Sequence, residues 1–135
     1  MEKETLKRIF YFLEEKEKQK APFIWKLVNN EPFTKEDLNV EGDLKLSHLE
    51  ISFLPEGLKV KGDLDLSYSK IKSLPEGLEV VDNLFLHNSK IKSLPKGLKV
   101  WGDIIINKTK LIHYYSNEEI REMVKPGFIK GEIYR

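Results

Sequence analysis

The 135-residue chain carries 23 basic and 22 acidic side chains, and its net charge of +1 excludes a strong positive field that attracts nucleic acid or anionic membranes. Cysteine is absent, so disulfide bonds, thiol nucleophiles and cysteine-ligated metals are excluded as well. The N-terminal residues MEKETLKRIF lack the apolar core of a secretion signal, and no run approaches a membrane span. The sequence therefore predicts a cytoplasmic protein, with export by a route without a classical signal left open.

Apolar side chains at helical spacing predict two helices within residues 1–36. The first helix is expected from Glu2 to about Lys18, with one apolar face made by Leu6, Ile9, Phe10 and Leu13. The second helix is expected to begin at Pro22, with an apolar face made by Ile24, Trp25, Leu27 and Val28. We predict that residues 1–36 form a helical N-terminal cap over the open end of the repeats that follow.

Residues 33–40 join this cap to the repeats. Residues 34–37 resemble a helix start, with the threonine as N-cap. The same segment also matches residues 53–60 in register, with Val40 in the position of Val60. We interpret residues 33–40 as a degenerate repeat that merges into the cap.

A 20-residue repeat fills the middle of the chain. Residues 62–81 read GDLDLSYSKIKSLPEGLEVV and residues 82–101 read DNLFLHNSKIKSLPKGLKVW, with SKIKSLP unchanged between them. A looser copy covers residues 42–61, and a fading copy begins at Gly102. A fixed period of this length predicts stacked units, because one unit cannot bury its own apolar face. Repeat arrays mostly present an extended surface to a partner, which points away from catalysis.

Equivalent residues of the copies form columns. An L-x-L or I-x-I pattern predicts four short strands at residues 44–46, 64–66, 84–86 and 104–106, stacked in parallel about 4.8 Å apart. The further inward columns are Ile51/Ile71/Ile91/Leu111, Leu54/Leu74/Leu94, Leu58/Leu78/Leu98 and Val60/Val80/Val100. The proline and glycine columns that begin at Pro55 and Gly57 predict an irregular return after each strand. The predicted fold class is an α+β repeat solenoid, with residues 37–113 as its repeats.

The pattern L-x-L-x-x-S-x-I-x-x-L-P-x-G-L resembles the leucine-rich repeat, in its short bacterial L-P-x subtype. The resemblance covers residues 37–112 and implies a protein-binding module without naming a partner. This subtype occurs in effectors of bacterial pathogens and in small phage or mobile-element proteins. The chain departs from the family in the column of the usual buried asparagine, where hydroxyl groups are expected to bond the backbone instead. This column holds Leu49, Ser69, Ser89 and Thr109.

Residues 114–135 are predicted to form a C-terminal cap made of a helix and an extended tail. A capping box at residues 116–119 opens the helix, which is expected to end near Pro126. The apolar residues of this helix are Ile120, Met123 and Val124, and those of the tail over the last turn are Phe128, Ile129, Ile133 and Tyr134.

The outward side of the predicted strands is the best candidate for a binding site. The inward columns hardly vary between copies, whereas the outward positions change in every copy, as expected of a rigid frame with a specific surface. Phe85 and Ile105 project from adjacent strands beside other rings, within a charged and polar rim. The alternative is that the C-terminal tail, through Tyr114 or Tyr115, folds over this face. The predicted partner-binding residues are Lys45, Asp65, Tyr68, Phe85, His87, Ile105 and Asn107.

A column of aspartates precedes the strands, and a calcium site there is conceivable because calcium prefers oxygen ligands. The favoured explanation is turn chemistry, in which each side chain bonds its own backbone two residues on. The column consists of Asp43, Asp63, Asn83 and Asp103.

Lysines and histidines complete the list of candidates. The column Lys70, Lys90 and Lys110 is expected to be a solvated edge, although a phosphate-tracking ridge is the alternative. His48 and His87 are expected to be isolated surface residues about 10 Å apart, too far to share a zinc ion.

The sequence contains no phosphate-binding glycine loop, nucleophile elbow or zinc-protease motif. No catalytic residue, metal or cofactor is therefore predicted, and the protein is not expected to be an enzyme. We predict a module that presents a rigid strand face to a protein partner, with self-association as a further use of the face. The alternative, from family analogy, is a small phage or mobile-element inhibitor that masks a host enzyme such as a defence nuclease, in the manner of an anti-CRISPR protein.

Overall fold

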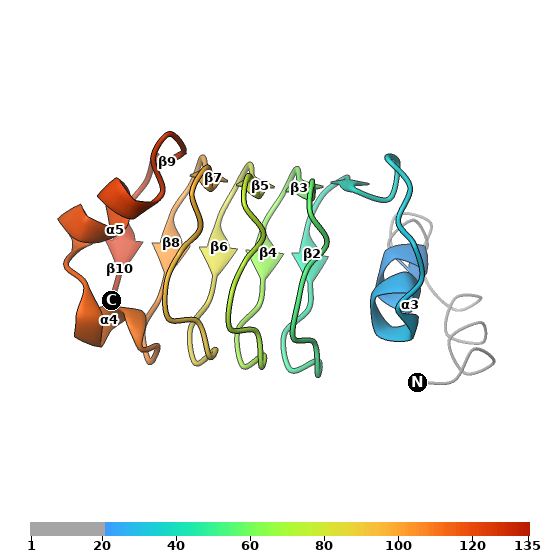
Figure 1. Cartoon of the computed structure of the whole chain (residues 1–135), viewed down its shortest axis with the longest axis horizontal. Helices are drawn as coiled ribbons and strands as arrows, with labels where there is room; N and C mark the ends of the chain where they lie inside the picture. The colour runs from blue at the N-terminus through green and yellow to red at the C-terminus, as the bar shows by residue number, and fades with distance from the viewer. Residues whose placement is uncertain (1–20) are drawn as a thin grey trace.

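The computed structural model describes residues 21–135, so the helix predicted between Glu2 and Lys18 lies outside the described residues. The described chain begins with helix α3 (Ala21–Asn29) and then winds into stacked turns (Figure 1). Helices α4 (Leu111–Tyr114) and α5 (Asn117–Met123) lie at the opposite end of the stack. The prediction of a repeat solenoid with parallel strands is confirmed.

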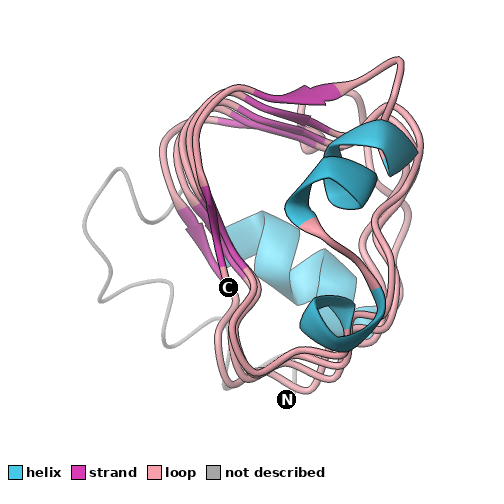
Figure 2. Ribbon diagram, turned by 90° about the vertical axis from the view of Figure 1, so that its left-hand side faces the viewer, coloured by secondary structure: helices cyan, strands magenta, loops and turns pink. Residues whose placement is uncertain are grey.

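Each turn of the solenoid contributes one strand to each of two parallel sheets (Figure 2). The first sheet contains β2 (Leu44–Lys45), β4 (Leu64–Asp65), β6 (Leu84–Phe85), β8 (Ile104–Ile105) and β10 (Ile133–Tyr134). The second sheet contains β1 (Asn39–Val40), β3 (Lys59–Val60), β5 (Glu79–Val80), β7 (Lys99–Val100) and β9 (Phe128–Ile129). Viewed along the stack, the sheets form two sides of the coil and meet at a corner.

The four strands predicted from the L-x-L pattern are present as the first sheet, each one residue shorter than expected. The predicted irregular return is present over residues 55–58, 75–78 and 95–98, but the sequence analysis missed the short strand that follows each return and belongs to the second sheet. The pairs Lys59-Val60, Glu79-Val80 and Lys99-Val100 place a polar residue outward and a buried valine inward. This alternation, together with the β-branched valine, is typical of a half-buried strand.

The register explains how the core forms. Leu64 lies beside Leu84 and Val60 beside Val80, so identical positions of successive turns meet. All the predicted inward columns are buried in one continuous cluster that runs the length of the stack. Phe23 and Leu27 of α3 belong to the same cluster at one end, and Ile120 and Val124 belong to it at the other.

Helix α3 has a different buried face from the one predicted. Phe23 and Leu27 are its buried residues, whereas Ile24 is half-buried and Val28 is exposed. Phe23 packs against Phe33 with the ring centroids 5.2 Å apart. The predicted face missed Phe23 because the helix is only two and a half turns long, and the hydrophobic residues cover most of its circumference.

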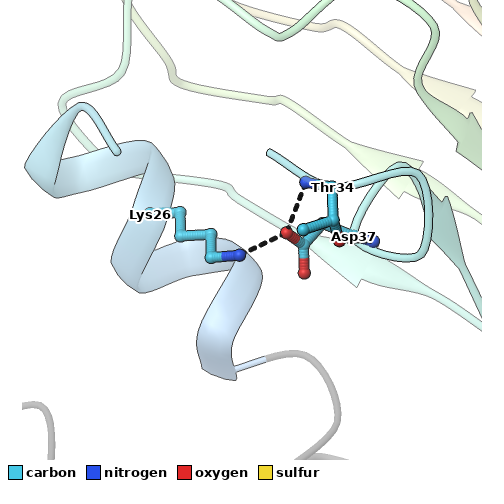
Figure 3. A network of polar contacts seen from close by, with 3 residues as sticks. All are labelled: Lys26, Thr34 and Asp37. Carbon is cyan, nitrogen blue, oxygen red and sulfur yellow. Dashed lines mark hydrogen bonds and ion pairs between the residues drawn. The ribbon is translucent and has the colours of Figure 1, made fainter. Parts of the chain in front are cut away.

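A polar network ties α3 to the start of the repeats (Figure 3). Lys26 donates a hydrogen bond to the Asp37 carboxylate, and that carboxylate also accepts the Thr34 backbone N–H at 2.8 Å. The Thr34 hydroxyl accepts the Asp37 backbone N–H at 3.2 Å in return. This is the reciprocal pattern of a helix start, but the chain makes only a turn and enters β1, so the predicted helix start is wrong. The predicted register is confirmed, because Val40 pairs with Val60.

The C-terminal segment closes the stack as an extension of both sheets. The capping box is present: the Ser116 hydroxyl accepts the Glu119 backbone N–H, and the Glu119 carboxylate accepts the Ser116 backbone N–H. The tail then pairs as β9 and β10 with β7 and β8. The last turn is longer than the others, with 29 residues between the equivalent positions Asp103 and Glu132, because it contains α4 and α5. Within residues 21–135, no helix is long and apolar enough to cross a membrane.

Leu74→Ala is expected to destabilise the solenoid by about 2–5 kcal/mol, because it removes a large buried side chain from the middle of a column. Leu74 is 7% exposed, and Leu54 and Leu94 occupy its position in the two neighbouring turns. Urea unfolding of the variant, with the exposed neighbour Ser73→Ala as the control, measures the effect. Equal urea midpoints for wild type and Leu74→Ala would contradict the assigned packing.

Asp37 predicts a pH-dependent part of the stability. Burial of the carboxyl group raises its pKa, but the hydrogen bonds from Lys26 and Thr34 and the charge of Lys26 outweigh burial, so the pKa of Asp37 lies below its ordinary value. A carboxyl group whose pKa is lowered by folding stabilises the protein above its unfolded pKa of about 3.9. This stabilisation is lost as the pH falls through the lower, folded pKa.

Asp37→Asn is therefore expected to reduce the free energy of unfolding by about 1 kcal/mol at neutral pH, and by much less once the pH has fallen through the lowered pKa of the folded wild-type carboxyl group. Comparing the two chains in urea at each pH removes the contribution of the other carboxylates. A difference between the chains that stays constant down to the acid limit would contradict the role of the Lys26 contact.

Candidate functional site

The outward side of the first sheet carries one continuous row of side chains, which we call the strand face row. Successive strands place Lys45 beside Asp65, Asp65 beside Phe85, Phe85 beside Ile105, and Ile105 beside Tyr134. Lys45 and Tyr134 are exposed, while the three residues between them are half-buried by their neighbours. The row is charged on the first two turns and apolar on the last three.

An aromatic cluster lies just beyond the strands. The ring of Tyr68, which is 46% exposed, stacks on His48 with the centroids 4.6 Å apart and the planes 9° apart. The His87 ring contacts the Tyr68 ring edge-on, with the two centroids 5.2 Å apart. The sequence analysis expected the two histidines to be isolated. They are not, because Tyr68 contacts both rings. One ring nitrogen of His87, Nδ1, is buried and has no hydrogen-bond partner among the described residues.

The residues that follow the strands adopt the left-handed conformation. This column contains Asn88 and His48, whose residue types occur at positive φ more often than most, and Tyr68 and Lys108, whose types rarely do. Their φ values lie between 55° and 63°. Strained backbone of this kind costs on the order of 1–3 kcal/mol per residue and is found at functional sites more often than elsewhere. Here it turns the chain out of the first sheet and presents the Tyr68 ring at the edge of the strand face row.

The structure brings the predicted site residues together on one side of the molecule. Phe85 and Ile105 are neighbours in the row, and Tyr68 with His87 borders it. Asp65 accepts hydrogen bonds from the backbone N–H and the hydroxyl of Ser67, which is itself buried. The sequence missed the fifth position of the row, Tyr134, which is 52% exposed.

The C-terminal tail extends the strand face row. Because β10 pairs edge to edge with β8, the described tail lies beside Ile105 in the sheet and supplies Tyr134 as the next outward residue. Tyr114 and Tyr115 were the alternative candidates to cover the face. Tyr114 is 63% exposed and its ring contacts Tyr115, and Tyr115 packs against the core. The sequence signal for this further strand is the adjacent pair Ile133 and Tyr134, of which the first is buried and the second is exposed.

A second aromatic group was also missed. Trp101, which is 49% exposed, meets Phe128 edge-on at 4.8 Å between centroids, and the Lys130 ammonium lies 4.9 Å from the Phe128 ring. These residues belong to the second sheet and to the corner, away from the strand face row. Tertiary pairing of β7 with β9 creates the group, so sequence spacing gives no direct sign of it.

The column of aspartates forms a ladder between turns. The Asp43 carboxylate accepts the Asp63 backbone N–H at 2.7 Å, and the Asp63 carboxylate accepts the Asn83 backbone N–H at 2.8 Å. The Asn83 and Asp103 side chains continue the pattern, each accepting the N–H of the next turn at 2.8 Å. The predicted bond to the backbone two residues on is therefore wrong. Exact stacking of the turns places the next turn's N–H closer than the residue's own.

Three carboxylates gather at the corner beside this ladder. Oxygen atoms of Asp43, Asp63 and Asp82 all lie within 4.8 Å of one another. Asp43 and Asp63 already use one oxygen each to accept a backbone N–H. Calcium takes 6–8 oxygen ligands, so the described residues offer too few for a dedicated calcium site.

The hydroxyl groups in the column of Ser69, Ser89 and Thr109 are only partly hydrogen-bonded. The Thr109 hydroxyl donates to the Ile106 carbonyl at 2.6 Å, which is a bond within its own turn and not to a neighbouring turn. The buried hydroxyls of Ser69 and Ser89 have no hydrogen-bond partner among the described residues, so the expected backbone bonds are absent there. The ladder of aspartates and Asn83 supplies the side-chain bonds between turns instead.

The lysine column lies at an exposed edge. Lys70 pairs with Glu50 at 3.2 Å, while Lys90 and Lys110 are exposed. Pairing of such exposed side chains contributes little to stability. This arrangement fits the expected solvated edge.

Comparison of the chain with protein-family models, with curated proteins and with solved structures finds no match.

The ladder predicts different results for two substitutions of Asp63. Asp63→Ala is expected to cost about 1–3 kcal/mol of stability, because it leaves the backbone N–H of the half-buried Asn83 without its acceptor. Asp63→Asn is expected to cost less than about 1 kcal/mol, because an amide oxygen can accept the same bond. Asn83 already does so in the next turn. Urea unfolding measures both variants, and an Asn variant as unstable as the Ala variant would show that charge, rather than the ladder bond, is what Asp63 contributes.

Proposed function

We propose that the protein is a non-catalytic binding module that presents the strand face row to a protein partner. The observation that carries the proposal is the apolar run Phe85, Ile105 and Tyr134 on three adjacent strands, bordered by the Tyr68 ring. Burial of such side chains by a partner contributes roughly 25 cal/mol per Å² of apolar surface. Aromatic anchors within a polar rim are the usual composition of an interface centre.

The proposal extends to the type of repeat. The fixed 20-residue register, the L-x-L strands and the buried leucine columns support membership of the leucine-rich repeats in their short bacterial subtype. The second parallel sheet follows the irregular return of each turn. The aspartate ladder takes the place of the family's usual asparagine. We further propose that α3 and α5 serve as caps, because Phe23, Leu27 and Ile120 close the two ends of the described core.

An inhibitor that masks a host enzyme would use the same rigid face, and a cytoplasmic target agrees with the absence of cysteine. The two proposals share one surface and differ only in the identity of the partner. A pull-down from the native host identifies that partner, and genes next to the coding sequence distinguish a phage inhibitor from a cellular module.

Phe85→Ala is expected to weaken binding of the captured partner by about 2 kcal/mol or more, a loss of about thirtyfold in affinity. The loss of stability is expected to stay below about 1 kcal/mol, because Phe85 contributes cross-strand contacts on the outward side and no core packing. Titration calorimetry measures the affinity and thermal unfolding measures the stability.

Lys90→Ala serves as the matched control, because Lys90 is exposed on the lysine edge of the same turn. It is expected to bind the partner with unchanged affinity. Retention of the partner by Phe85→Asp as well as by Lys90→Ala would place the binding site elsewhere.

A further inference from the structure

We propose that the segment bound by the strand face row carries a lysine or arginine next to its apolar anchor. The inference rests on the proposed function and names the chemistry of the partner: a protein segment that is basic at one end and apolar at the other. Its basic end lies over the aspartates of the first turns, and its apolar end lies over Phe85, Ile105 and Tyr134.

The charge of the face differs in sign from that of the whole chain. The outward positions of β2, β4, β6 and β8 and of the residues just before these strands include four aspartates and one lysine: Asp43, Asp63, Asp65, Asp103 and Lys45. Asp82 adds a further exposed carboxylate at the corner. The net charge of the chain is +1, so the face is an acidic surface on a neutral protein.

The negative charge is not neutralised within the described part of the chain. The ion pairs between residues 21 and 135 join lysines to Asp37, Glu41, Glu50, Glu79 and Glu122, and none includes an aspartate of the strand face. The bonds that Asp43, Asp63 and Asp65 accept come from neutral backbone N–H groups or a hydroxyl. Like charges held within 4.8 Å of one another favour a cation from outside.

The acidic and apolar parts of the face adjoin. Asp65 is the register partner of Phe85, so the backbone positions of an acidic residue and of the first apolar anchor lie one strand spacing, about 4.8 Å, apart. Asp82 stands three positions before Phe85 on the same turn. A single bound segment can therefore contact both an aspartate and the apolar anchor Phe85. Complementary charge at such a junction selects the partner and sets its direction along the stack.

The test uses the full chain and a random peptide library displayed on phage, with Phe85→Asp as the chain for counter-selection. Peptides that bind only the wild type are expected to contain an aromatic or long aliphatic residue with an excess of lysine and arginine on one side. A synthetic peptide from this pool is expected to bind Asp82→Asn about two- to fivefold more weakly than wild type. Raising sodium chloride from about 50 to 500 mM is expected to weaken binding to wild type further.

Asp82→Asn is the informative variant, because the Asp82 carboxylate makes no hydrogen bond or ion pair among the described residues and the ladder stays intact. Glu76→Gln is the matched control, with the same change of charge at an exposed site beyond the strand face row. It is expected to bind the peptide like wild type. Amide chemical shifts then locate the peptide, with changes expected at Asp63, Asp82 and Phe85.

Each contrary result has a separate meaning. Selected peptides without basic enrichment, or with affinity unchanged in Asp82→Asn, overturn the inference and leave the proposed function standing. Peptides that bind Phe85→Asp equally well, or no enriched peptides at all, count against both. Calcium chloride alone, without peptide, is titrated in parallel; saturable shifts at Asp43, Asp63 and Asp82 would mean that the corner binds an ion, which also overturns the inference.

Discussion

The constraint on which the whole structure depends is the fixed interval of 20 residues between equivalent positions of the central turns. It makes leucine meet leucine and valine meet valine along the axis, which buries a continuous core in a chain of modest length. The same interval aligns the backbones of two sheets at once. The last turn keeps both registers despite its extra length, because α4 and α5 hold the additional residues outside the two sheets.

The corner between the sheets shows how one interaction shapes both fold and surface. Each aspartate or asparagine of the ladder accepts the N–H of the next turn, which requires the chain to pass very close beneath it. Gly102 occupies such a crossing, where a Cβ atom would lie 2.5 Å from the Asn83 side-chain oxygen. The carboxylates that hold the turns together also bring negative charge to the border of the strand face. The aspartates that stabilise the stacking of the turns therefore also give the proposed binding surface its negative charge.

The two ends of the row have different characters because the copies are not identical. Lys45 and Asp65 come from early turns, whereas Phe85, Ile105 and Tyr134 come from later turns and the tail. The frame beneath them hardly changes, so the outward residues can vary without loss of packing. The backbone is strained at Tyr68 and Lys108, because they adopt positive φ values that Asn88 in the same column accommodates more easily.

The sequence by itself determined the repeat, its register, the buried columns and most of the strand face. The repeat period and the pattern of hydrophobic residues can be read directly along the chain. Phe85, Ile105 and His87 were predicted as outward for this reason. Only the tertiary structure decided that the return segments pair as a second sheet, that the tail adds Tyr134 to the face, and that Trp101 meets Phe128. It also decided that the aspartates bond the next turn rather than their own. These features depend on contacts between residues 20 or more apart, and the stacking that creates those contacts exists only once the chain has folded.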